Sequence, residues 1–349
     1  MVMPRPQAAG VFSFLKPYTF TLLIVPMKSK TLLSMSLSAL FFSFLLWVGS
    51  CKKETTNDPV SGDTFRLYNY SMKGLETRTD FAFSHEAGFL ENRALDECSG
   101  LVACTYNDHW VWAANDGGDI NRLFLVDIRN AGDAGFVRIP SAGNRDAEDL
   151  ALDWTPVNGQ RYLYWGDIGD NNAVYPGLIV YRFPEPQFDT SSLPLDTSSQ
   201  PCERLTFVYE DGARDAESLI IDPLTHDLYI VTKRENKARL YLANFPFDAQ
   251  RTDTLKALGE FPISGFVGAD ISRDGRLIAV KTYGAIYCWD RSPDERLEDA
   301  FMRAPKQLPY KGEVQGESFA WLYEAGNDSP SGYATVSEGA GAPLRIYKR

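Results

Sequence analysis

Asp146-Ala-Glu-Asp-Leu-Ala-Leu-Asp153 is the stretch that decides the fold, because it returns downstream as Asp215-Ala-Glu-Ser-Leu-Ile-Ile-Asp222. In both copies an acidic residue opens a short apolar strand. Weaker copies of this strand begin near Glu97, Gly268 and Gln315, and two further apolar strands follow each copy. Self-similarity of this kind is the signature of a repeat architecture.

The spacing of the copies indicates the size of one repeat. Their acidic residues are separated by 51, 69, 53 and 47 positions, and they are Glu97, Glu148, Glu217, Asp270 and Glu317. A four-stranded propeller blade with its loops has about this period. The sequence therefore predicts an all-β chain with a single five-bladed β-propeller over residues 64–349.

A fourth strand is expected in each gap between copies, but the fifth copy ends at the C-terminus without one. We expect residues 65–70 to supply it and close the ring, because closure removes free sheet edges. Six blades are the alternative, with residues 79–83 opening an additional degenerate blade.

In a propeller the innermost strand of each blade lines the axis, so the five acidic residues are expected around one mouth of the channel. Carboxylates gathered in this way repel one another unless they are protonated, hydrogen-bonded or neutralised by a cation. A hard cation with oxygen ligands fits, which favours calcium over magnesium. The alternative is structural: each acid accepts backbone N–H groups of a neighbouring blade and fixes the blade spacing.

The loops joining second and third strands share this face, and they are polar in every copy. A second cation or ligand cluster is predicted there, in competition with simple turns, at Asp116, Asp119, Asp167, Asp170 and Asn171. Tyr283, Ser337 and Glu338 are expected to face a ligand. Lys233 and Lys281 would either hold an anion or act as counter-ions of the carboxylates.

The N-terminal region predicts export. Met27 opens a short basic segment, an apolar run follows, and small residues precede Cys51, which is the lipobox pattern of bacterial lipoproteins. We expect residues 1–50 to be a signal segment whose true start is Met27, Cys51 to be lipidated, and residues 51–63 to be a tether. A plain transmembrane anchor is the alternative. The expected location is the outer membrane or the cell surface.

Composition limits the partners. Residues 1–50 hold four basic and no acidic residues, so the remainder carries 31 basic and 46 acidic ones. Such an acidic body argues against nucleic acid as a partner and against membrane contact other than through the lipid. We expect a monomer. Free thiols are expected, with one long-range disulfide as the alternative, at Cys98, Cys104, Cys202 and Cys288.

Several motifs are familiar, among them Trp165-Gly-Asp-Ile-Gly-Asp-Asn171, Ile230-Val-Thr-Lys233 and Gln315-Gly-Glu317. Together with the two long copies, they resemble a family of exported bacterial β-propeller lipoproteins. The acid-marked strands are also similar to those of calcium-dependent apyrases and of the SdiA-regulated propeller proteins. The resemblance implies calcium. It does not imply nucleotide hydrolysis, because the active-site residues of apyrases cannot be matched one by one.

Two functions compete. The first is a binding or scaffolding module that recognises an unknown envelope ligand. The second is a calcium-dependent hydrolase of phosphoesters or related esters, with Glu148, Glu217 and Glu317 on the metal. In that enzyme Asp149 or Asp167 would activate water, and Lys233 and Lys281 would steady a small anionic substrate. A Ser-His-Asp hydrolase is not expected, because the chain has three histidines and no G-x-S-x-G motif.

Overall fold

The computed structural model describes residues 64–349. The predicted signal segment, Cys51 and the tether lie outside these residues. The described part contains strands β1 to β22, one short α-helix, α1 (Leu297–Ala300), and one 3-10 turn, η1 (Thr190–Ser192). The prediction of an all-β protein is confirmed. None of the helical segments among residues 64–349 has the length and apolar character needed to cross a bilayer.

Twenty of the strands form five antiparallel units of four, which we number along the chain. Unit 1 is β3 (Cys98–Ala103), β4 (Trp110–Asn115), β5 (Arg122–Asp127) and β6 (Gly132–Arg138); unit 2 is β7 (Ala147–Leu152), β8 (Tyr162–Asp167), β9 (Leu178–Pro184) and β11 (Glu203–Tyr209); unit 3 is β12 (Ala216–Ile221), β13 (Leu228–Thr232), β14 (Arg239–Ala243) and β15 (Thr252–Glu260); unit 4 is β16 (Phe266–Ile271), β17 (Leu277–Thr282), β18 (Ile286–Asp290) and β19 (Lys306–Leu308); unit 5 is β20 (Ser318–Leu322), β21 (Gly332–Val336), β22 (Pro343–Lys348) and β2 (Ala82–Phe89).

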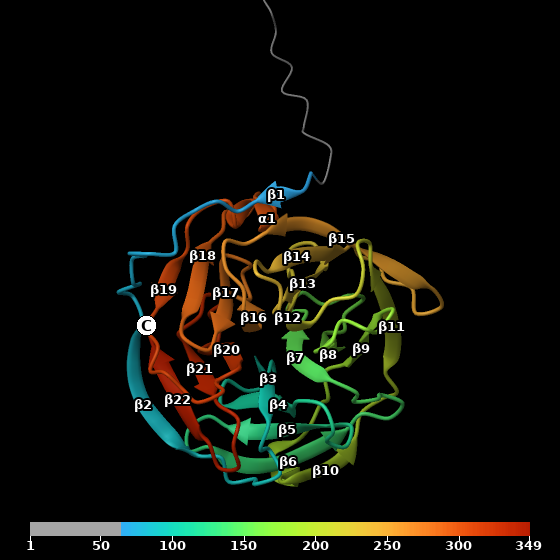
Figure 1. Ribbon diagram of the computed structural model, residues 1–349. Helices are drawn as coiled ribbons and strands as arrows, with labels where there is room; N and C mark the ends of the chain where they lie inside the picture. Colours follow the sequence, from blue (N-terminus) through green and yellow to red (C-terminus); the bar gives the residue numbers. More distant parts are fainter. Residues whose placement is uncertain (1–63) are drawn as a thin grey trace, which may run out of the picture. The chain divides into compact units, whose positions relative to one another are not determined.

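The first strands of the five units surround a common centre (Figure 1). They contact one another in a closed cycle, β3 to β7, β12, β16, β20 and back to β3. All residues of these strands are buried. Strands that are covered on both faces read as continuous apolar runs rather than alternating ones, which accounts for the sequence of each copy.

The strand that completes unit 5 differs from the prediction. Ala82–Phe89 (β2) pairs antiparallel with β22, whereas residues 65–70 contribute only β1 (Arg66–Leu67), which pairs in parallel with β15. Residues 79–83 lead into β2 and do not open another unit. The strand β2 could not be predicted from the sequence, because its side chains are exposed or half-buried and therefore show no hydrophobic alternation.

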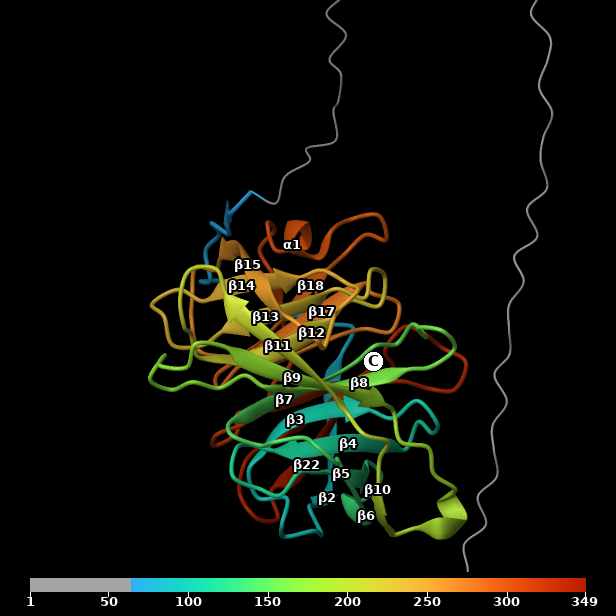
Figure 2. The ribbon, with the colours of Figure 1, turned by 90° about the vertical axis from the view of Figure 1, so that its right-hand side faces the viewer.

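Two additional parallel pairings tie the periphery together. β10 (Leu195–Ser198), which comes from the β9–β11 connection, pairs with β6 of unit 1. Outer strands β11 and β15 also pair in parallel, which joins units 2 and 3 into one continuous sheet. Figure 2 shows this sheet at the side of the ring, with β1 and α1 beside β15.

The cysteines follow the main expectation. Cys98, Cys104, Cys202 and Cys288 are free thiols, and all except Cys202 are buried. No disulfide links residues within the described part of the chain.

Candidate functional site

Two of the five predicted acids occupy equivalent places at the start of an inner strand. The register of the β7–β8 pair shifts between Ala147 and Asp149, and that of β12–β13 shifts between Ala216 and Ser218. Glu148 and Glu217 are therefore the bulged residues. A β-bulge re-aims its side chain, and here it places both carboxylates at the same end of the ring.

Glu317 directly precedes β20 and joins the same group, because Lys233 forms an ion pair with Glu217 and lies 3.7 Å from Glu317 Oε1. The side chains of Glu148, Glu217 and Glu317 are all buried. The prediction that acids from different copies gather at one end is thus met by these three residues.

Glu97 occupies a different position. Its carbonyl accepts the N–H of Asp116, as the carbonyl of Asp146 accepts that of Gly169. Glu97 therefore corresponds to Asp146 and not to Glu148, and it is exposed. In unit 1 the residue at the bulge is Ser99, which carries no charge.

Asp270 also departs from the expected ring. It lies beyond the bulge of β16, is fully buried, and accepts backbone hydrogen bonds from Ile271 at 2.8 Å and from Trp321 at 2.9 Å. Since Trp321 belongs to unit 5, Asp270 connects neighbouring inner strands. This is the structural role that the sequence left open for these acids.

Asp149, a candidate base, has the same kind of role. Its carboxylate accepts backbone N–H groups from Leu150 at 2.8 Å, Leu219 at 2.9 Å and Ala269 at 3.2 Å, and thereby joins units 2, 3 and 4. Burial raises the pKa of Asp149 well above its ordinary value. Because its oxygens are occupied by backbone donors inside the ring, Asp149 is poorly placed to activate water.

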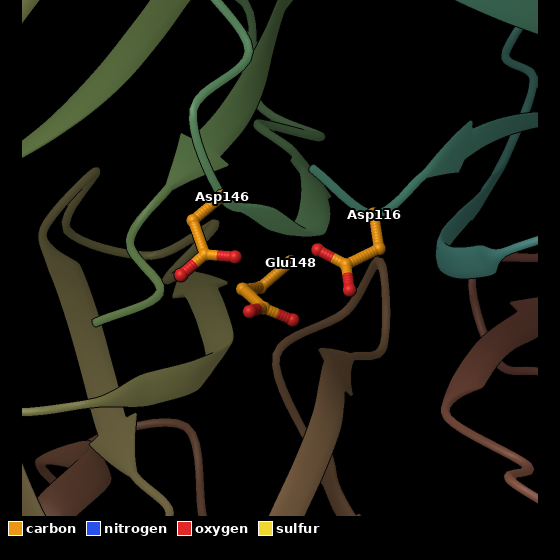
Figure 3. A group of neighbouring side chains, drawn as sticks. All are labelled: Asp116, Asp146 and Glu148. Atoms are coloured by element: carbon orange, nitrogen blue, oxygen red, sulfur yellow. The ribbon is translucent and has the colours of Figure 1, made fainter. Parts of the chain in front are cut away.

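Asp116, Asp146 and Glu148 form what we call the open triad (Figure 3). One carboxylate oxygen of each lies within 4.8 Å of the other two. Figure 3 shows the three carboxylates turned toward one another, with Asp116 reaching in from the β4–β5 loop. No basic side chain among residues 64–349 forms an ion pair with any of them.

Glu148, Asp215 and Glu217 form a second group, the paired triad, which shares Glu148 with the first. Its other two members already have cationic partners. Lys233 pairs with Glu217, and Arg234 Nε lies 2.5 Å from Asp215 Oδ2. The two triads are therefore alike in spacing but different in charge balance.

Within the described part of the chain, Glu148 has no hydrogen-bond or ion-pair partner at the mouth, and Glu217 Oε2 beside it is likewise buried without a hydrogen bond. Glu148 is 3 % exposed, yet its carboxylate accepts no hydrogen bond from the described residues, 64–349. Burial, followed by the charges of Glu217 and Asp116, raises its pKa well above the ordinary value. Burial also raises the pKa of Asp116, to about 6. Burial and the neighbouring acids therefore favour the protonated form of Glu148, whereas a bound cation would favour its ionised form.

Gly169 lies directly against two carboxylates of the open triad. A Cβ at this position would overlap Glu148 Oε1 and would lie 2.6 Å from Asp146 Oδ2. The Gly169 N–H also donates to the Asp146 carbonyl at 3.0 Å. Only glycine therefore allows the β8–β9 loop to approach both carboxylates so closely.

The second cluster predicted from the loops does not exist as one group. Of its members, Asp116 belongs to the open triad. Asp119 forms an ion pair with Arg122 at 2.8 Å, and Asp167 accepts the N–H of Asp146 at 3.0 Å.

The other two members of that predicted cluster hold their own loop in place. Asp170 accepts the N–H groups of Val174 at 3.0 Å and Tyr175 at 2.7 Å, and Asn171 accepts a hydrogen bond from Arg234. These contacts match the alternative of a turn fixed by Asx hydrogen bonds.

The remaining ligand-face candidates divide into two kinds. Lys281 of β17 is fully buried, donates to the Gly316 carbonyl and lies 3.9 Å from Glu313, so it acts as a counter-ion between unit 4 and the connection that leads into β20. Ser337 is also buried. Tyr283 is exposed and donates to Glu317 at 2.5 Å, while Glu338 is half-buried and accepts from Gln315 at 2.8 Å.

Asp146 and Asp215 were not among the predicted site residues, although they begin the two clearest copies. The signal that marks them is the tripeptide Asp-Ala-Glu at 146–148 and 215–217. It places two acids on either side of a small residue, and the bulge then brings both carboxylates to the mouth.

The open triad offers the ligands of a hard cation. Calcium and magnesium both prefer oxygen donors, and carboxylate oxygens gathered within 4.8 Å of one another can contact a single ion. All three side chains offer hard oxygen donors, and no histidine or cysteine belongs to the group.

Comparisons with known proteins give no family. No family model matches the sequence, and no curated protein matches it. Among solved structures, the chain is similar to the PQQ-bound aldose sugar dehydrogenase of Streptomyces coelicolor, with 10 % identity, TM-score 0.42, and coverage of 78 % of this chain and 99 % of that one.

Two other solved structures are similar. One is an auxiliary nutrient binding protein from Bacteroides ovatus, with 12 % identity, TM-score 0.40, and coverage of 77 % and 65 % of the two chains. The other is the Cps50 (Swd1) beta-propeller domain of Myceliophteria thermophila, with 12 % identity, TM-score 0.36, and coverage of 72 % and 82 %. At these identities no residue role can be transferred to this chain.

Proposed function

We propose that the chain is a calcium-binding module whose open triad, Asp116, Asp146 and Glu148, holds one ion at the mouth of a five-bladed propeller. The observation that carries the proposal is Glu148, a residue that is 3 % exposed and whose carboxylate has no hydrogen-bond partner among residues 64–349. An ionised carboxylate in this position is costly unless a positive charge neutralises it. The five units are then the blades.

The charge balance selects one triad over the other. Lys233 and Arg234 already neutralise Glu217 and Asp215 in the paired triad. A divalent ion would have to compete with both basic groups there, whereas in the open triad it competes only with protons. We therefore assign a single ion, with Glu148 as its most buried ligand.

In the cell, this module is an exported lipoprotein that is anchored through Cys51 and acts in binding or scaffolding at the envelope. The lipobox before Cys51 and the acidic body support this assignment. Metabolic labelling with a fatty acid tests it: the native chain incorporates label, and Cys51→Ser does not. Label retained in Cys51→Ser would refute lipidation at this residue.

The hydrolase alternative receives less support from the geometry. Asp149 accepts three backbone N–H groups, and Lys281 is fully buried against Gly316. Lys233 remains at the mouth, but it is held by Glu217. Turnover of a phosphoester panel with calcium, lost in Lys233→Ala while calcium binding persists, would establish the enzyme instead.

Calcium binding is tested by titration calorimetry and thermal unfolding of the full chain, with Glu148→Gln as the key variant. At a calcium concentration of one hundred times Kd, binding stabilises the native chain by about 2.7 kcal/mol. This corresponds to a melting temperature about 5–10 °C higher. Glu148→Gln should lose this gain.

Glu148→Gln should also be at least as stable as the native chain in chelator, because it removes a buried unpaired carboxylate. A variant that is less stable than the native chain in calcium but at least as stable in chelator has lost a metal ligand, whereas a variant with a damaged fold would be less stable in both. Glu324→Gln is the matched control, an exposed acid in the β20–β21 turn at the opposite end. A normal calcium response in Glu148→Gln would overturn the proposal.

A further inference from the structure

Two exposed tyrosines flank the acidic mouth, and the proposed calcium site does not use them. Tyr175 of the β8–β9 loop is 41 % exposed, and Tyr283 of the β17–β18 loop is 40 % exposed. Both loops lie on the face of the open triad. A tyrosine beside a polar site offers a ligand both an apolar ring face and a polar hydroxyl.

Contacts connect each ring to the acids. Arg145 lies over Tyr175, with 4.0 Å from its guanidinium carbon to the ring centroid, and donates to the Gly169 carbonyl beside Glu148 at 3.0 Å. Tyr283 donates to Glu317 at 2.5 Å. Each ring is thus one contact away from the acids, Tyr175 through Arg145 and Tyr283 directly through Glu317.

The loop that carries Tyr175 is fixed in place by hydrogen bonds. Asp170 accepts the N–H groups of Val174 and Tyr175, and its own N–H donates to Asp215 Oδ1 at 2.8 Å. These bonds fix the loop to unit 3 before any ligand arrives. A preorganised aromatic surface binds at a smaller cost in conformational entropy than a mobile one.

The charges disfavour an anionic ligand. The basic groups at the mouth are Arg145, Lys233 and Arg234, and each is already engaged by protein oxygens. Uncompensated acids remain, including Glu97 and Glu338. The groups left for a ligand are therefore carboxylate acceptors, the cation itself and the ring faces of Tyr175 and Tyr283 that Arg145 and Lys233 do not cover.

We infer that the mouth binds a neutral saccharide, an inference that rests on the proposed calcium site. A sugar has apolar C–H faces that stack on aromatic rings and hydroxyl groups that donate to carboxylates. Its vicinal hydroxyl oxygens supply the hard ligands that calcium prefers. Neutral charge suits a site whose basic groups are all occupied.

The test uses the full chain and titration calorimetry with mannose, galactose and fucose and with polysaccharides built from them, with calcium and with chelator. We expect binding to at least one saccharide in calcium and its loss in chelator. Tyr175→Ala should weaken that binding about tenfold, equivalent to about 1.4 kcal/mol, with calcium affinity unchanged. Tyr175→Phe should restore it, because the ring is kept.

Tyr106→Ala is the matched control, since Tyr106 is 43 % exposed in the β3–β4 turn at the opposite end of the ring. It should bind saccharide as the native chain does. If calcium binds but saccharides do not, or if oligolysine binds in their place, the saccharide inference is wrong and the calcium proposal stands. If calcium itself fails to bind, both fall.

Discussion

Asp149 offers the sharpest test of how the ring is held together. The residue is 2 % exposed, and its carboxylate accepts N–H groups from Leu219 and Ala269 of units 3 and 4 in addition to Leu150 of its own strand. Asp149→Ala leaves the two inter-strand N–H groups without an acceptor, at about 1–3 kcal/mol each. Removal of the buried carboxylate offsets part of this, so we expect a net loss of about 3 kcal/mol.

The assay is urea unfolding of the full chain in chelator, followed by tryptophan fluorescence. Asp149→Asn should lose about half as much as Asp149→Ala, because its amide keeps one acceptor oxygen. Asp294→Ala, which removes an exposed acid, is the control and should lie within about 0.5 kcal/mol of the native chain. A loss below about 1 kcal/mol in Asp149→Ala would refute the bridging role.

The sign of the pH dependence gives a second measurement on the same residue. Burial raises the folded-state pKa of Asp149 above its unfolded value. The folded state then binds more protons than the unfolded state between the two pKa values, so this residue's contribution to stability falls as pH rises through that window. The stability difference between the native chain and Asp149→Asn should shrink in the same direction. A difference that grows with pH would contradict the assignment.

Three further predictions concern other parts of the chain. Arg291 and Asp222 form a buried bidentate pair with both distances at 2.8 Å, so Arg291→Met should cost about 3–5 kcal/mol in urea unfolding; a cost under 1 kcal/mol would contradict it. Burial lowers the pKa of Lys281 to about 8 from 10.5, so stability should rise with pH over that interval, and Lys281→Met should abolish the rise. Native-state titration with a thiol reagent should modify Cys202 before the other three described cysteines, which are buried; equal rates would count against this fold.

Much of the fold could be predicted because each copy of the repeat carries the same run of buried apolar residues. The inner strands are covered on both sides, so each copy carries an apolar run that no short exposed strand could imitate. The closing strand β2 could not be found in this way, since it is the outermost strand of its sheet and few of its side chains are covered. The exposed Phe83 and Phe89 do not distinguish it from a loop.

The site was harder to predict because a single-residue bulge decides where a side chain points. The sequence spacing matched Glu97 to Glu148, although the strand pairing places Glu97 at the position equivalent to Asp146. The same count made Asp270 a mouth residue, whereas it lies deeper and holds backbone N–H groups. Asp116 belongs to the triad but lies in a loop. The position of a loop side chain cannot be predicted from sequence periodicity, because a loop has no regular backbone geometry.

The pairing of β2 with β22 joins residues 82–89 to residues 343–348. Because the chain is synthesised from its N-terminus, β2 is made early but stays unpaired until almost every other strand has been made. Loop closure over such a distance is slow, and a strand without its partner is open to mispairing. Clipping the last strand after folding would leave β2 without its partner and unit 5 with only its two inner strands, β20 and β21.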